Sequence, residues 1–180
     1  MNQTLKNVLV VHASITAEQF RRFSYFNGLV LKHRYLGLIA FAVLLALFGW
    51  CNLITGSPFL CWLFVATGIL IPGIYLAQYR RSINAQIIRL NLNHAACDAY
   101  TVGFSSRGIY IDRGSEHVSY DWKALHSAHR VGDCTYLYYT PERALILPDS
   151  CITNAAPTDL WKLLSNHMTE KNIKKWRIRL

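Results

Sequence analysis

The feature that most constrains this chain is a long stretch without charge, residues 35–79. The stretch holds no Asp, Glu, Lys or Arg, so all 19 Lys and Arg residues and all 10 Asp and Glu residues lie outside it. A surface helix of a soluble protein keeps a charged face for water. The stretch therefore argues against an ordinary soluble enzyme and predicts helices inside a membrane.

The length of this stretch fits two membrane spans. A helix needs about 20 apolar residues to cross about 30 Å of hydrocarbon. We expect spans over residues 35–54 and 58–79, joined by Thr55, Gly56 and Ser57, with Pro58 in the first turn of the second helix. So short a link predicts an antiparallel hairpin.

The flanking charges predict the orientation of this hairpin. Lys32 and Arg34 precede the first span, Arg80 and Arg81 follow the second, and the link has no charge. Basic flanks stay in the cytoplasm, so we expect a multi-pass membrane protein with both termini cytoplasmic. A cleaved signal peptide is not expected, because the first span begins late and is too long.

Small residues on the two spans predict close helix contact. They are Ala42 and Ala46 on the first span and Ala66, Gly73 and Ala77 on the second. Small residues let membrane helices approach closely, either within the hairpin or against a second chain. Neither span holds an ionisable residue of the kind that proton and ion pathways need, so transport by this chain alone is not expected.

Residues 1–34 carry signals of a strand and a helix. β-branched residues predict a strand over residues 7–13, and Thr16 is a typical helix N-cap. Phe20, Phe23, Phe26 and Val30 then share one helical face. That face could lie on the membrane surface or pack on the cytoplasmic domain, and periodicity alone does not separate the two.

Residues 80–180 predict a small β domain. Residues 82–93 could extend the second span as a stalk helix. Alternating apolar residues over 98–148, separated by turn signals, predict five or six short strands in an antiparallel meander, which the N-terminal strand could join. A last helix is expected over 158–171 with Thr158 as its cap, followed by a basic tail. The expected fold class is thus an α+β membrane protein with three segments, 1–34, 35–79 and 80–180.

At this point the chain resembles the YcxB-like membrane protein family. The resemblance rests on the order and spacing of short motifs: SITAEQF at 14–20, Phe104, GIYI at 108–111, YDWK at 120–123, YLYY at 136–139 and ALILP at 144–148. It implies a two-span hairpin with a pleckstrin-homology-like cytoplasmic β domain. It implies no catalytic residues.

Cysteine and histidine patterns give no sign of a chemical site. The five cysteines form no Cys-x-x-Cys pair and are expected as free thiols, with a Cys51–Cys61 disulfide as the alternative. His126 and His129 would point to opposite faces of a strand, so no metal or other cofactor is expected. The chain has no nucleotide-binding glycine loop, nucleophile elbow or paired-histidine motif, so we expect no enzyme.

The net charge of +9 points to the membrane surface. Basic residues beside a membrane attract anionic lipid by about 1 kcal/mol each, although positive-inside bias alone could explain them. The candidates for lipid contact are Arg80, Arg81, Lys174, Lys175, Arg177 and Arg179. Nucleic acid is not an expected partner, because proximity to the membrane already accounts for the charge. Trp122 is expected in the core.

We therefore expect a non-enzymatic inner-membrane protein that presents a small β domain to a membrane partner or to anionic lipid headgroups. Self-association is also possible for such a hairpin. The alternative is an accessory or immunity protein whose hairpin binds and blocks a membrane-active partner.

Overall fold

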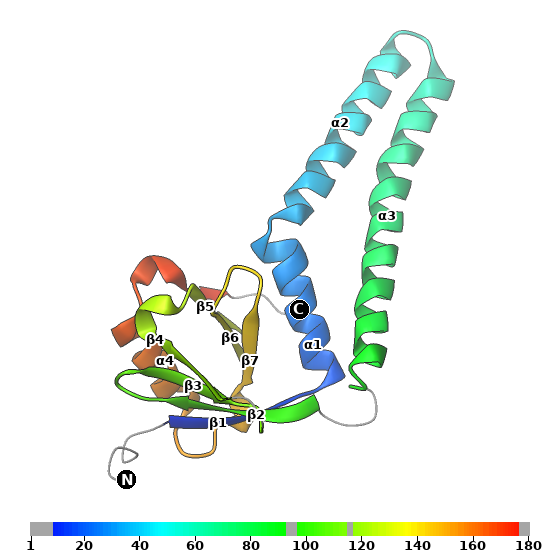
Figure 1. Cartoon of the computed structure of the whole chain (residues 1–180). Helices are drawn as coiled ribbons and strands as arrows, with labels where there is room; N and C mark the ends of the chain where they lie inside the picture. Colours follow the sequence, from blue (N-terminus) through cyan, green and yellow to red (C-terminus); the bar gives the residue numbers. More distant parts are fainter. Residues whose placement is uncertain (1–8, 93–96, 115–116, 177–180) are drawn as a thin grey trace, which may run out of the picture. The chain divides into compact units, whose positions relative to one another are not determined.

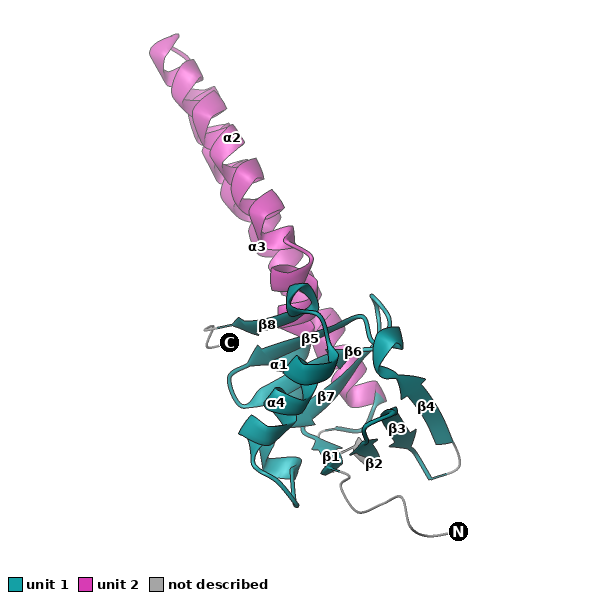
Figure 2. Ribbon diagram, turned by 90° about the vertical axis from the view of Figure 1, so that its left-hand side faces the viewer, with its two compact units in different colours: residues 1–23, 90–180 teal, residues 24–89 magenta. Residues whose placement is uncertain are grey.

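The computed structural model describes residues 9–92, 97–114 and 117–176, apart from the side chains of residues 97–99 (Figure 1). The chain divides into two compact units, residues 24–89 and residues 1–23 with 90–180 (Figure 2). The second unit is thus built from both ends of the chain, and the first is inserted into it.

The unit of residues 24–89 contains the two expected long helices. Helix α2 spans Arg34–Ile54 and helix α3 spans Pro58–Arg89, and both are long and apolar enough to cross a membrane. Gly56 in the link has a φ of 84°, a conformation that glycine adopts without strain. Helix α3 continues through residues 80–89, as the stalk interpretation expected.

Glycines form the contact between α2 and α3. A Cβ on Gly49 would lie 3.2 Å from the Cys61 carbonyl oxygen, and one on Gly68 would lie 3.3 Å from Leu45 Cβ. The predicted small-residue face takes part in this contact through Ala42, which lies next to Gly68. A Cβ on Gly73 would meet nothing within 4 Å, and Ala46, Ala66 and Ala77 are exposed, so for these residues only the alternative of contact with a second chain stays a prediction. The contact follows the alternating spacing of three and four residues that packed helix pairs use, at 42, 45 and 49 and at 61, 65 and 68.

A short π-helical turn, η1 (Phe26–Leu31), precedes α2 and packs against α3. The hydroxyl of Tyr79 donates to the Ser24 carbonyl oxygen at 2.6 Å, and the Tyr25 ring lies edge-on to the Tyr79 ring. A Cβ on Gly28 would fall 1.8 Å from the Tyr79 hydroxyl oxygen. Only glycine at this position therefore lets the Tyr79 ring lie where it does.

The other unit contains two four-stranded sheets. The first has the order β1-β2-β3-β4 and is antiparallel, and the second has the order β7-β6-β5-β8, in which β8 runs parallel to β5. The strands are β1 (Leu9–Ile15), β2 (Cys97–Phe104), β3 (Gly108–Asp112), β4 (His117–Asp121), β5 (Ser127–Val131), β6 (Cys134–Tyr138), β7 (Ala144–Pro148) and β8 (Ile173–Trp176).

Five or six strands were expected after the hairpin, and the structure has six over residues 97–148. The strand expected before the hairpin is also present, and there are two differences from the prediction. The 3₁₀ turn η2 (Trp122–Ala124) separates β4 from β5, so the strands form two sheets instead of one meander. The basic tail, for which no element was predicted, supplies β8. Because β8 is reached through helix α4 (Pro157–His167), it can return parallel to β5.

The core lies between the two sheets and under α4. Val11, Val102, Leu137, Leu160 and Leu164 are fully buried in it. Trp122 is buried as expected and donates its indole N–H to the Ser105 carbonyl oxygen at 3.0 Å. The core therefore draws on strands from both sides of the hairpin and on the C-terminal helix.

Helix α4 differs from the prediction at both ends, since it ends at His167 and not at residue 171 and begins with another cap. The capping residue is Ala156, Pro157 occupies the first helical position, and Thr158 lies inside the helix. Proline is favoured at that first position because its φ suits a helix and it has no N–H to satisfy. The Asp159 carboxylate accepts the Ala156 N–H at 3.2 Å, which is the half of a capping box that needs no acceptor at the cap position.

Candidate functional site

The residues predicted to contact lipid fall into separate parts of the chain. Arg80 and Arg81 are exposed on α3, in the unit of residues 24–89. Lys174 and Lys175 are exposed on β8, in the other unit. Arg177 and Arg179 lie outside the described residues.

The two lysines of β8 do not form one patch. Neighbouring residues of a strand point to opposite faces. Lys174 Nζ lies 5.8 Å from the Trp176 ring on its own strand, whereas Lys175 Nζ lies 5.2 Å from the Trp161 ring of α4. Each ammonium group is thus held over an aromatic face, and each faces a different surface.

Strand β8 is anchored to β5 through a buried histidine. The indole N–H of Trp176 donates to His129 Nδ1 at 3.1 Å, and His129 Nε2 lies 3.1 Å from the Ser127 hydroxyl. An indole nitrogen only donates, so His129 is neutral with its proton on Nε2. Burial, with Lys174 and His126 nearby, lowers the pKa of His129 to about 4.

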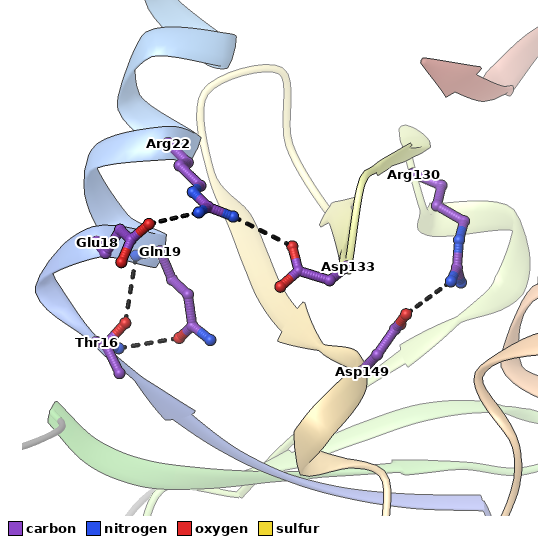
Figure 3. A network of polar contacts seen from close by, with 7 residues as sticks. All are labelled: Thr16, Glu18, Gln19, Arg22, Arg130, Asp133 and Asp149. Carbon is purple, nitrogen blue, oxygen red and sulfur yellow. Dashed lines mark hydrogen bonds and ion pairs between the residues drawn. The ribbon is translucent and has the colours of Figure 1, made fainter. Parts of the chain in front are cut away.

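Helix α1 (Ala17–Tyr25) begins with the expected cap, drawn in Figure 3. Gln19 N donates to Thr16 Oγ1 at 3.3 Å, and Thr16 N donates to Gln19 Oε1 at 3.0 Å. This reciprocal pair is a capping box and confirms Thr16 as the N-cap.

The aromatic face of α1 packs on the second sheet. The Phe23 ring lies edge-on to Tyr136, with ring centres 5.1 Å apart, and 6.3 Å from the Tyr138 ring. Of the two alternatives for this face, the structure supports packing on the β domain for Phe23. Both tyrosines are buried, and burial raises their pKa.

Ion pairs connect α1 and the ends of the β5–β7 strands (Figure 3). Arg22 pairs with Glu18 and lies 3.4 Å from the Asp133 carboxylate in the β5–β6 turn. Arg130 of β5 pairs with Asp149 at 2.7 Å, and Asp149 N donates to the Asp133 carbonyl oxygen at 2.8 Å. Burial raises the pKa of Asp149, and Arg130 opposes that rise.

The described cysteines are free thiols. Cys51 and Cys61 are not bonded to each other, so the alternative disulfide is wrong. Burial raises the pKa of Cys134 to about 12, which keeps this thiol protonated and a poor nucleophile. Among the described residues, no three His, Cys, Asp or Glu side chains come together in a way that could hold a metal ion.

Sequence reasoning missed a polar pocket in the β domain. Arg113, just after β3, and Arg143, just before β7, line it together with Tyr120 and Tyr139. The two arginines come from different hairpin turns, and only the fold brings them to one pocket. Spacing along the sequence gives no signal of such a pair.

Residues 104–164 match the family model described as YcxB-like protein. The match runs from the end of β2 into α4 and includes every quoted motif except SITAEQF at 14–20. It confirms the predicted resemblance over this part of the chain. No curated protein and no solved structure matches the chain significantly.

Proposed function

We propose that this chain is a non-enzymatic protein of the bacterial inner membrane, and that the α2–α3 hairpin anchors a pleckstrin-homology-like β domain at the cytoplasmic face. The β domain binds a membrane-protein partner or anionic lipid headgroups. The observation that carries the proposal is the apolar surface of the hairpin. Only 6% of the residues in the most apolar part of each helix are buried.

The side chains on this surface are large. Phe59, Trp62 and Ile54 have exposed fractions of 77%, 73% and 72%. A core helix of a soluble protein would bury such residues, and apolar patches of this extent normally meet a membrane or another protein. At the end of the hairpin where α2 begins, Arg34 donates to the Tyr75 hydroxyl at 3.3 Å. Basic residues and tyrosine are both typical of the cytoplasmic interface of a membrane.

The pairing of β1 with β2 supports a topology in which both flanks of the hairpin lie on the same side of the membrane. Strand β1 precedes α2 and β2 follows α3, and the two strands pair from Leu9 with Phe104 to Ile15 with Cys97. Segments that pair in one sheet must lie on the same side of any membrane that the hairpin crosses. The positive-inside rule then favours the cytoplasmic side for both.

The order of strands supports the pleckstrin-homology-like assignment. A four-stranded antiparallel sheet is followed by the β5-β6-β7 meander and then by α4, which fits the expectation of a small β domain with a C-terminal helix. Three titratable groups of the β domain favour structural over catalytic roles. The Cys134 thiol stays protonated, Asp149 forms an ion pair with Arg130, and both ring nitrogens of His129 form hydrogen bonds.

The test uses the full-length chain in nanodiscs of phosphatidylcholine. We expect these nanodiscs to float with vesicles that contain phosphatidylglycerol, to stay behind with pure phosphatidylcholine vesicles, and to be released by high salt because screening weakens the attraction. Lys174→Gln with Lys175→Gln should reduce flotation, and Lys162→Gln on α4 is the matched control. Equal flotation with both kinds of vesicle would reject headgroup binding.

The accessory or immunity function is the second candidate. It is favoured by the small residues Ala46, Ala66, Gly73 and Ala77, which lie exposed on the hairpin and are not used in the α2–α3 contact. A tagged chain purified from mildly solubilised native membranes should then carry a stoichiometric foreign membrane protein, and Ala46→Leu should release it. A chain recovered alone or only with itself argues against this candidate.

A further inference from the structure

The pocket missed by sequence reasoning has two cationic side chains and an aromatic wall. Arg113 and Arg143 line a cavity of about 170 Å³ together with Ile111, Val118, Tyr120 and Tyr139. The rings of Tyr120 and Tyr139 are 5.3 Å apart, and Arg143 is fixed in its turn by its backbone N–H, which donates to Thr140 Oγ1 at 3.0 Å.

The charge of this pocket is not neutralised within the described part of the chain. No carboxylate there forms an ion pair with Arg113 or Arg143. Asp112 is adjacent to Arg113 in sequence, but its carboxylate accepts the Gly114 N–H at 2.9 Å and lies 3.3 Å from His117. No carboxylate of the described residues therefore competes with an anion for these two guanidinium groups.

A second cavity of about 160 Å³ also has Arg113 in its lining. It is mainly apolar, and its lining includes Phe20, Phe23, Leu90, Leu92, Leu145 and Ile146 in addition to Arg113. The Arg113 guanidinium lies 5.7 Å from the Tyr100 ring, which also lines this cavity. Arg113 thus forms part of the wall of both a polar and an apolar cavity.

We propose that the two cavities together bind one single-chain anionic amphiphile. Its phosphate-type head lies between Arg113 and Arg143, and its hydrocarbon chain lies in the apolar cavity. Arginine holds such oxyanions through paired N–H bonds. Ligand pockets usually measure about 300–1,000 Å³, so each cavity is large enough for only one part of a ligand. The anionic class of ligand rests on the headgroup binding proposed above, whereas the location of the site and the single hydrocarbon chain of the ligand go beyond that proposal.

Calorimetric titration of the full-length chain in a neutral maltoside detergent tests this site. The probes are octyl phosphate, inorganic phosphate and octanol. We expect octyl phosphate to bind saturably and at least tenfold more tightly than either fragment. Arg143→Gln should lower the affinity for octyl phosphate at least tenfold, and Arg143→Lys should lower this affinity less. Ala144→Leu adds a larger side chain to the wall of the apolar cavity. It should lower the affinity for octyl phosphate and leave the affinity for inorganic phosphate unchanged.

Arg107→Gln is the matched control, because Arg107 is an equally exposed arginine on another turn and lines neither cavity. It should leave octyl phosphate binding unchanged, and thermal melting shows whether each variant is folded. Inorganic phosphate or octanol binding as tightly as octyl phosphate would overturn the proposal, as would a folded Arg143→Gln that binds normally. If the protein does not bind octyl phosphate but still floats with anionic vesicles, this site is rejected and the proposed function stands.

Discussion

At the residue scale, Tyr100 joins the two sheets through a single hydroxyl group. It donates to the Ile146 carbonyl oxygen at 2.8 Å and accepts the Ile146 N–H at 2.9 Å, in a buried setting. Strand β7 is at the edge of its sheet, so Tyr100 supplies Ile146 with partners that a neighbouring strand would otherwise give.

Removing this hydroxyl leaves two buried backbone groups without a partner. We expect Tyr100→Phe to lower the free energy of unfolding by about 2–6 kcal/mol, since each of the two groups costs about 1–3 kcal/mol. Urea unfolding of the detergent-solubilised chain measures the change. Tyr110→Phe is the control, because no hydrogen bond of that hydroxyl occurs in the described part of the chain. An equal effect of both substitutions would contradict this role.

His129 makes the stability of the β domain depend on pH. Its pKa is about 4 in the folded chain, below the usual 6.5. Between these values the unfolded chain binds a proton that the folded chain does not, so stability falls as the pH falls. The protonated ring would also lose the bond from Trp176.

We therefore expect the free energy of unfolding to drop by about 1–2 kcal/mol from pH 7 to pH 5 through this group. His129→Gln should remove that part of the pH dependence, and His126→Gln should retain it. Unfolding of the three proteins at both pH values gives the measurement. A His129→Gln profile identical to that of the unsubstituted chain would refute the assignment.

At the element scale, the α2–α3 contact depends on Gly68, which packs on Ala42 and Leu45, and not on the exposed Ala46, Ala66 and Ala77. A leucine at Gly68 must displace Leu45 and Ala42, and overpacking of this kind costs about 1–3 kcal/mol. Gly68→Leu should lower the melting temperature of the hairpin in detergent, whereas Ala46→Leu should change it little. Equal melting of the two variants would show that the contact lies elsewhere.

Elements whose signals are local could be predicted from the sequence. The charge-free stretch predicts both helices, Gly56 predicts the turn, and Thr16 with Gln19 predicts the start of α1. In β3, Ile109 and Ile111 are buried and Tyr110 is partly exposed, which is the alternation of a strand with one face toward the core. Strand β6, by contrast, is buried along its whole length.

Elements decided by tertiary contact could not be predicted. Strand β8 exists because Trp176 reaches His129, and nothing near residue 176 in the sequence indicates that partner. The choice of Gly49 and Gly68 depends on how the two helices are rotated about their axes. The Arg113 and Arg143 pocket depends on two distant turns. Each is a pairing between segments that only folding brings together.

At the scale of the whole molecule, the β domain needs residues from both sides of the hairpin. Val11 and Ala13 of β1 are fully buried, and β1 pairs with β2 along most of its length. We expect a fragment of residues 90–180 to be unfolded or aggregated, because it lacks these residues and leaves the edge of β2 unpaired. Adding residues 9–23 through a flexible linker should restore folding, as judged by amide dispersion in NMR spectra. A folded 90–180 fragment would contradict the insertion.

The central claim is a membrane hairpin with the β domain in the cytoplasm, and protease protection tests it most directly. The full-length chain is digested in spheroplasts and in inverted inner-membrane vesicles. The proposed topology predicts an intact chain in spheroplasts and, in inverted vesicles, loss of the β domain with a protected fragment that contains α2 and α3. Digestion of the β domain in spheroplasts, or release of the chain by alkaline carbonate, would contradict the account.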